Sequence, residues 1–155
     1  MPQLKKRGKY IFGWSVVDGG YRISLPPEAI AEYGILKEKQ VIIISGSKRT
    51  GGFCISRKGL LEKSALKDLF VVHPELIRNG IQEGTFIKYK GRLYCWLFIS
   101  EQGVLSLTRD ISKTLEISIN QKLLSIRGSD IAFVMGAKGP IIQRAQEYIG
   151  QIPLF

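Results

Sequence analysis

Hydrophobic residues along the chain fall into short runs separated by glycine-rich or charged turns, a pattern typical of a mainly β protein with short helices. Two runs rich in aromatic and β-branched residues predict strands at residues 10–17, "YIFGWSVV", and 92–99, "RLYCWLFI". A polar turn and a second, shorter strand follow each of them. Helices are expected where apolar residues recur at three- and four-residue spacing instead.

The same order of elements occurs twice. Beyond the two strands, each half continues with a short helix, an apolar strand, a loop, a fourth strand and a helix. These are expected at 26–34, 40–45, 52–56 and 59–70 in the first half, and at 108–116, 122–127, 132–136 and 139–150 in the second. A shift of 82 positions aligns Trp14 with Trp96 and Ser24 with Ser106, and it drops to 80 where the loop "SKRTGG" is longer than "SD". The chain is therefore predicted to contain two tandem copies of one unit.

We place the first repeat at residues 9–66, a helical connector at 67–90 and the second repeat at 91–150. One unit of four short strands cannot bury both faces of its sheet, and it leaves strand edges unpaired. Two such units can interleave and close a barrel, which removes the edges. Residues 1–155 are therefore expected to form a single domain, and the equivalent tryptophans, Trp14 and Trp96, to pack in its core.

Residues 17–44, "VDGGYRISLPPEAIAEYGILKEKQVIII", resemble the AbrB/MazE/SpoVT family of swapped-hairpin proteins, which are cradle-loop barrels. The family pattern is V-D-x-x-G-R-x-x-I-P, followed by a short helix ending in L-G-I and an apolar strand. Val17, Asp18, Arg22 and Pro26 match it, whereas Tyr21 stands where the family usually has glycine. The resemblance implies an α+β fold, mainly β with short helices. In it, an AbrB-like barrel forms as a pseudo-dimer of the two repeats within one chain.

The formal net charge of +10 favours an acidic partner, most often nucleic acid. Residues 1–59 carry eleven Lys and Arg against four acids, so the first repeat should attract such a partner more strongly. Many members of the family bind DNA as transcription regulators, through arginines near the first turn and in the short helix. Here Arg22 and Lys113 occupy such positions, while Val104 is the second-repeat equivalent of Arg22. The resemblance implies double-stranded DNA as a partner, bound mainly by the first repeat.

Two further basic segments are candidates for phosphate contacts. The stretch "KKRGK" resembles an N-terminal arm that could lie along DNA, and "GSKRTGG" is a glycine-flanked loop. Such contacts add salt-dependent affinity but read no sequence. The predicted nucleic-acid-binding residues are Lys5, Lys6, Arg7, Lys9, Arg22, Lys48, Arg49 and Lys113.

Residues suited to catalysis or metal binding are sparse. His73 is the only histidine, and Cys54 and Cys95 form no CxxC motif. We therefore expect neither an enzyme nor a metal or cofactor site. Two cysteines, no secretion signal and no long apolar run predict a cytoplasmic protein with no membrane partner, and a homo-oligomer is possible.

Two other functions stay open. The barrel could bind a small ligand or a nucleotide, or it could serve as a protein-interaction module without DNA binding. Retention on heparin at graded salt separates DNA binding from the protein-interaction function, and a thermal-shift screen with nucleotides tests the small-ligand function.

Overall fold

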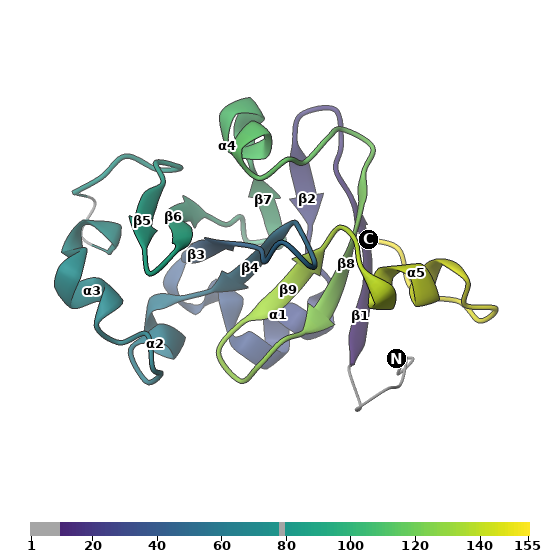
Figure 1. Ribbon diagram of the computed structural model, residues 1–155, viewed down its shortest axis with the longest axis horizontal. Helices are drawn as coiled ribbons and strands as arrows, with labels where there is room; N and C mark the ends of the chain where they lie inside the picture. Colours follow the sequence, from purple (N-terminus) through teal and green to yellow (C-terminus); the bar gives the residue numbers. More distant parts are fainter. Residues whose placement is uncertain (1–9, 78–79) are drawn as a thin grey trace.

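The computed structural model describes residues 10–77 and 80–155 of the chain. Its main element is a seven-stranded antiparallel sheet with the strand order β1-β8-β9-β4-β3-β6-β5. A separate two-stranded sheet pairs β2 with β7, and short helices surround both sheets (Figure 1). The protein is therefore mainly β with short helices, as the hydrophobic pattern predicts.

The elements have the following bounds. The strands are β1 Ile11–Val16, β2 Arg22–Ser24, β3 Gln40–Ser45, β4 Phe53–Ser56, β5 Ile87–Tyr89, β6 Arg92–Phe98, β7 Val104–Ser106, β8 Lys122–Arg127 and β9 Phe133–Gly136. The helices are α1 Pro27–Tyr33, α2 Lys58–Leu61, α3 Leu69–Val72, α4 Thr108–Thr114 and α5 Pro140–Gln146. Two 3-10 helices are η1 Ile35–Glu38 and η2 Pro74–Leu76. The segment 67–90 between the predicted repeats thus contains α3, η2 and β5.

The first strand of each half pairs with the third strand of the other half. β1 lies against β8 with Trp14 opposite Leu124, and β6 lies against β3 with Trp96 opposite Ile42. Adding 82 to the number of Trp14 gives Trp96, and adding 82 to that of Ile42 gives Leu124. The two pairings therefore have the same register, except at a bulge near Gly13 in β1.

The remaining inter-half pairs join equivalent strands. β4 lies against β9 with Cys54 opposite Val134, and β2 lies against β7 with Ile23 opposite Leu105. Within each half, β3 pairs with β4 and β8 pairs with β9. Each of the strands β1–β4 thus makes backbone hydrogen bonds to one of the strands β6–β9 of the other half. The main sheet therefore cannot form from one half alone.

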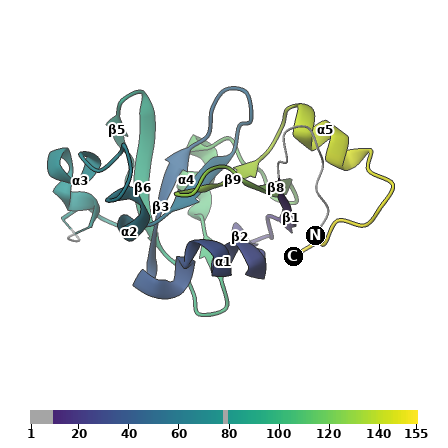
Figure 2. The same ribbon diagram turned by 90° about the horizontal axis from the view of Figure 1, so that it is seen from below.

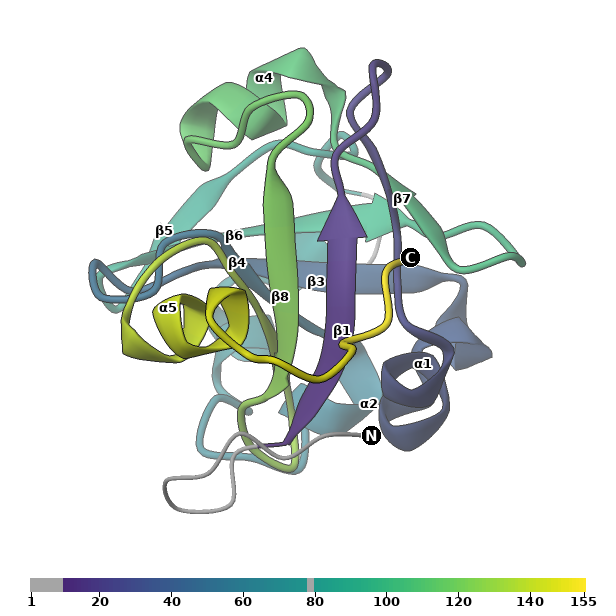
Figure 3. The same ribbon diagram turned by 90° about the vertical axis from the view of Figure 1, so that its right-hand side faces the viewer.

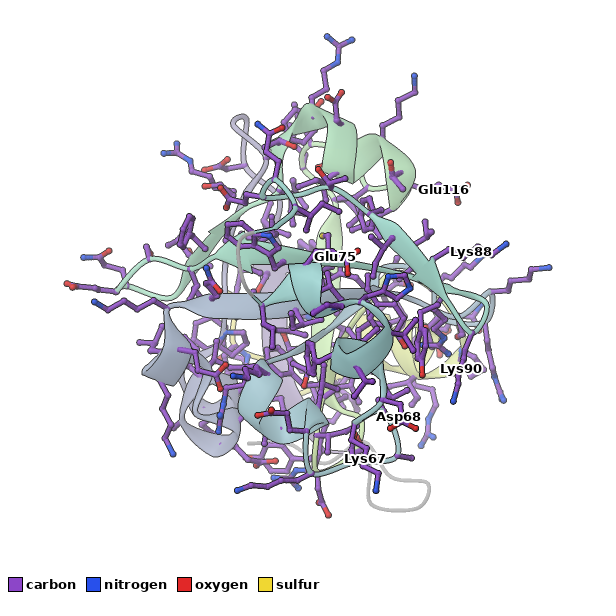
Figure 4. All side chains as sticks on the ribbon, turned by 90° about the vertical axis from the view of Figure 1, so that its left-hand side faces the viewer. Lys67, Asp68, Glu75, Lys88, Lys90 and Glu116 are labelled. Carbon is purple, nitrogen blue, oxygen red and sulfur yellow. The ribbon has the colours of Figure 1, made fainter. Side chains whose placement is uncertain are left out.

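The two edges of the main sheet are protected differently. Residues 153–155 lie along β1, since the Trp14 amide donates to the Pro153 carbonyl (2.8 Å) and the Phe155 amide donates to the Trp14 carbonyl (2.7 Å). At the other edge, β5 has three residues, and the side chains of Lys88 and Lys90 point outward there (Figure 4). A short edge strand flanked by lysines discourages pairing with another chain.

The core has one large cluster and two smaller ones. The large cluster includes Ile23, Leu105, Phe53 and Phe133 and lies between the main sheet, the β2–β7 pair and the helices α1 and α4. The second cluster packs α2 and α3 on the sheet, and the third packs α5 on β1 and β8. Figure 2 shows α2 and α3 at the opposite end of the molecule from α5.

Both tryptophans pack as expected from their equivalent positions. Trp96 is buried in the second cluster, and its indole nitrogen donates to the Ile81 carbonyl (2.8 Å). Trp14 is half-buried and packs against the third cluster, next to Ile152. Their indole rings contribute apolar area to folding, which accounts for an aromatic residue at this position in both halves.

The helix predicted over residues 59–70 is wrong in its length. α2 ends at Leu61, and α3 begins only at Leu69 after a series of turns. The Ser64 hydroxyl donates to the Leu61 carbonyl (2.7 Å) and accepts from the Leu66 amide (3.0 Å). A serine side chain that bonds to nearby backbone competes with the helical hydrogen bonds, and this interrupts the helix.

Because β4 and β9 approach each other closely, adding one methyl group at Gly52 should strongly destabilise the fold. Gly52 has φ +60°, and a Cβ atom there would lie 1.9 Å from the Met135 carbonyl oxygen. Gly52→Ala should therefore lower the free energy of unfolding by about 2–4 kcal/mol. Gly19→Ala is the matched control, because a Cβ at Gly19 meets no atom within 4 Å. Urea unfolding of both variants checks this, and equal stability of the two would contradict the strand packing.

Candidate nucleic-acid interface

The turn between β1 and β2 is built around the carboxylate of Asp18. Its Oδ1 atom accepts hydrogen bonds from the backbone amides of Gly20 (2.8 Å) and Arg22 (2.9 Å). Tyr21 adopts φ +60°, in the left-handed region that favours glycine. A glycine would adopt this conformation more easily than a tyrosine, and the capping carboxylate helps to hold Tyr21 in it.

Arg22 leaves this turn with its side chain in solvent. Its Nε atom donates to Asp18 Oδ2 (3.2 Å), and the two side chains are 61% and 47% exposed. Hydrogen bonds from the Arg22 and Gly20 amides lower the pKa of Asp18, and the Arg22 charge lowers it further. The backbone of Arg22 is therefore fixed, while an exposed ion pair of this kind is weak enough for an incoming anion to compete for the guanidinium.

Helix α4 lies at the same end of the molecule as this turn (Figure 3). The Leu107 amide, next to the start of α4, donates to the Tyr21 carbonyl (2.9 Å) and so ties the helix to the turn. Arg109 and Lys113 are exposed on α4. We call Arg22, Arg109 and Lys113 the α4 face. Arg109 was missed in the sequence because it matches no family arginine, although it follows Thr108 at the start of a predicted helix.

Lys48 and Arg49 do not belong to the α4 face. They are exposed on the β3–β4 loop, which projects toward a different side of the molecule in Figure 3. Arg49 instead lines a pocket together with Lys138 and Arg144. The remaining predicted residues, Lys5, Lys6, Arg7 and Lys9, lie outside the described part of the chain.

Two arginines near α1 are engaged in bonds to glutamates. Both nitrogens Nε and Nη2 of Arg127 bond to the carboxylate of Glu32 on α1. Arg57 donates to Glu38 (2.7 Å) through Nη1 and to the Tyr33 carbonyl (2.8 Å) through Nε. These arginines fasten α1 and η1 to the rest of the protein. A phosphate would have to displace those bonds, so Arg57 and Arg127 are less available to an anion than the more exposed Arg22.

His73 lies beside an acidic and an aromatic side chain, and the Cys95 thiol is buried. His73 is half-buried at the end of α3, with Nδ1 3.6 Å from Glu75 Oε1 and its ring edge-on to Tyr89. Burial raises the pKa of the Cys95 thiol to about 12, so this thiol is not a nucleophile near neutral pH. Across residues 10–77 and 80–155, no three His, Cys, Asp or Glu side chains gather into a group that could hold a metal ion.

No protein-family model matches the chain, and no curated protein matches it. Within the described ranges, none of the helices has the length and apolar character needed to cross a bilayer.

The Asp18 turn predicts a specific pH dependence. The pKa of this carboxyl lies below its ordinary value of 3.8 in the folded protein, so its ionised form stabilises the fold. This stabilisation is fully present above pH about 4 and is lost as the pH falls through the folded-state pKa. Asp18→Ala should therefore be less stable than the parent protein at neutral pH, and the difference should shrink in acid. Urea unfolding at a series of pH values checks this, and a difference that stays constant down to pH about 2 would contradict it.

Proposed function

We propose that the protein is a DNA-binding transcription regulator of the AbrB type that contacts double-stranded DNA through its α4 face. The observation that carries this proposal is Arg22, whose backbone is fixed by the Asp18 turn beside the exposed cations of α4. The arginine comes from the first repeat, in the family position, and the chain as a whole has a net charge of +10. No catalytic role is part of the proposal.

A swapped-hairpin barrel, formed as a pseudo-dimer of the two repeats, is the second part of the proposal. Its support is that β1–β8 and β6–β3 have equivalent registers, while β4–β9 and β2–β7 join equivalent strands. β1 lies at one edge of the open main sheet and β6 lies next to the other edge. β2 follows β1 along the chain and β7 follows β6, so the β2–β7 pair connects these two distant strands. In this proposal, that link completes the barrel wall.

Arg22 suits a contact to DNA for two reasons. A fixed backbone leaves less conformational freedom to be lost on binding, and a planar guanidinium can donate two parallel hydrogen bonds to a phosphate or to a guanine edge. Asp18 competes for the same group, which favours a strong acceptor such as phosphate or the guanine O6 and N7 atoms. Lys113 and Arg109 then provide charge for neighbouring phosphates.

The remaining basic residues are proposed to play a supporting role. Residues 1–9 would add affinity that falls with salt and does not depend on sequence. Lys48 and Arg49 lie on another side, so they would contribute only to long-range attraction unless the DNA bends around the protein. In this proposal, the DNA contacts only the side of the molecule that carries the α4 face.

Replacing Arg22 should weaken binding selectively. If the guanidinium contacts a base, Arg22→Ala should weaken binding to a preferred duplex by on the order of 1–3 kcal/mol. Lys67→Ala is the charge control, because it removes one exposed positive charge far from the α4 face. Figure 4 shows Lys67 at the opposite end of the molecule from Glu116, which follows α4 in the chain. Gel-shift titration of sites selected from a random duplex library checks this.

Two results of that titration would contradict the proposal. One is the absence of any duplex bound more tightly than bulk DNA, which would exclude sequence-reading regulation. The other is an equal loss of affinity in Arg22→Ala and Lys67→Ala, which would show that net charge alone holds the DNA. Unfolding curves of both variants exclude a loss of fold as the cause.

A further inference from the structure

A pocket of about 500 Å³ lies between the β3–β4 loop, β9 and α5, away from the α4 face. Both cationic side chains and aliphatic groups line it. The cations are Arg49, Lys138 and Arg144, and the apolar groups are Ile126, Pro140, Ile141 and Ile142. The volume falls in the range of small-molecule sites, which combine an apolar lining with a few charged or polar groups.

The loops that carry two of the cations are held together. The Thr50 carbonyl accepts hydrogen bonds from the amides of Ala137 (2.9 Å) and Lys138 (3.0 Å), which joins the β3–β4 loop to the end of β9. Beside this contact, Gly52 approaches the Met135 carbonyl so closely that no side chain fits. The backbones of Arg49 and Lys138 are therefore fixed relative to each other, and a site that is formed before binding loses less entropy when it is occupied.

The charge of the pocket favours an anion. Asp and Glu are both missing from the ten residues that line it, all of them in the described part of the chain. An anionic ligand would neutralise the positive charge that Arg49 and Lys138 bring to this pocket. Arginine and lysine side chains together bind phosphate well, the first through paired hydrogen bonds and the second as a point charge. Arg49 and Lys138 together match the charge of a dianionic phosphate better than that of a single carboxylate.

The first half has an ion pair beside the residues that correspond to Lys138 and Gly139. Lys58 and Gly59 correspond to Lys138 and Gly139 in the repeat. There, Glu38 Oε2 accepts from Arg57 Nη1 (2.7 Å) and from the Gly59 amide (3.0 Å). In the second half, Asn120 replaces the glutamate. Ala137 replaces Arg57 as well, so the second half lacks this ion pair altogether.

We propose that this pocket binds a small phosphate monoester with an apolar body. The phosphate lies between Arg49 and Lys138, and the apolar body lies against Ile141 and Ile142. The site is separate from the α4 face, so the inference does not depend on DNA binding.

Phenyl phosphate is a suitable probe, with inorganic phosphate and phenol as its two separated parts. Isothermal titration should give binding of phenyl phosphate that is at least about ten-fold tighter than that of either part. Lys138→Ala and Arg49→Ala should each weaken it by about ten-fold or more, since each removes a charge-assisted hydrogen bond. Lys58→Ala, the repeat-equivalent exposed lysine, and Arg22→Ala should each bind it as the parent protein does.

Several outcomes would overturn the inference. No heat of binding for phenyl phosphate, or equal affinity for phenyl phosphate and inorganic phosphate, would show that the pocket does not recognise such an ester. An equal loss in Lys58→Ala and Lys138→Ala would reduce the effect to net charge. Displacement of phenyl phosphate by duplex DNA in both the parent protein and Arg22→Ala would make the pocket part of a nucleic-acid surface instead.

Discussion

The exchange of strands between the two halves is the constraint on which the rest of the structure depends. β1 finds its hydrogen-bond partner in β8, and β3 finds one of its two partners in β6. Each half on its own would leave rows of backbone amides and carbonyls without partners and the apolar faces of its strands in water. The two halves share one sheet and one large core cluster. The contacts that fold each half are therefore also the contacts that hold the two halves together.

This exchange also determines where charge appears on the surface. Since β2 pairs with β7, the turn that precedes β2 meets the start of α4, and Arg22 of the first half comes to the same end as Lys113 of the second. Likewise, the β4–β9 pair brings the β3–β4 loop of one half against the residues before α5 of the other. Both candidate binding sites therefore combine residues that are far apart in sequence. The two halves differ at these places: Val104 is the repeat equivalent of Arg22, and Ser64 is that of Arg144.

Much of the fold could be predicted from the sequence, because the strands are short, apolar and bounded by clear turns. The two copies of the strand pattern and the equivalent tryptophans follow directly from hydrophobic periodicity and the repeat. The end of α2 could not be predicted, since it depends on how the Ser64 hydroxyl bonds to nearby backbone. The separation of Arg49 from Arg22 could not be predicted either, because charge composition carries no information on which side of a sheet a loop lies. The pocket beside Arg49 depends on three segments meeting, which only the tertiary structure defines.

Native-state hydrogen exchange measured against denaturant tests the shared fold most directly. If the two halves form one cooperative unit, the most protected amides of β1, β3, β6 and β8 should all exchange through the same global opening. They should then give the same free energy and the same dependence on denaturant. Separate openings would contradict the account, with amides of β1, β3 and β4 exchanging at one free energy while those of β6, β8 and β9 stay protected to a higher one.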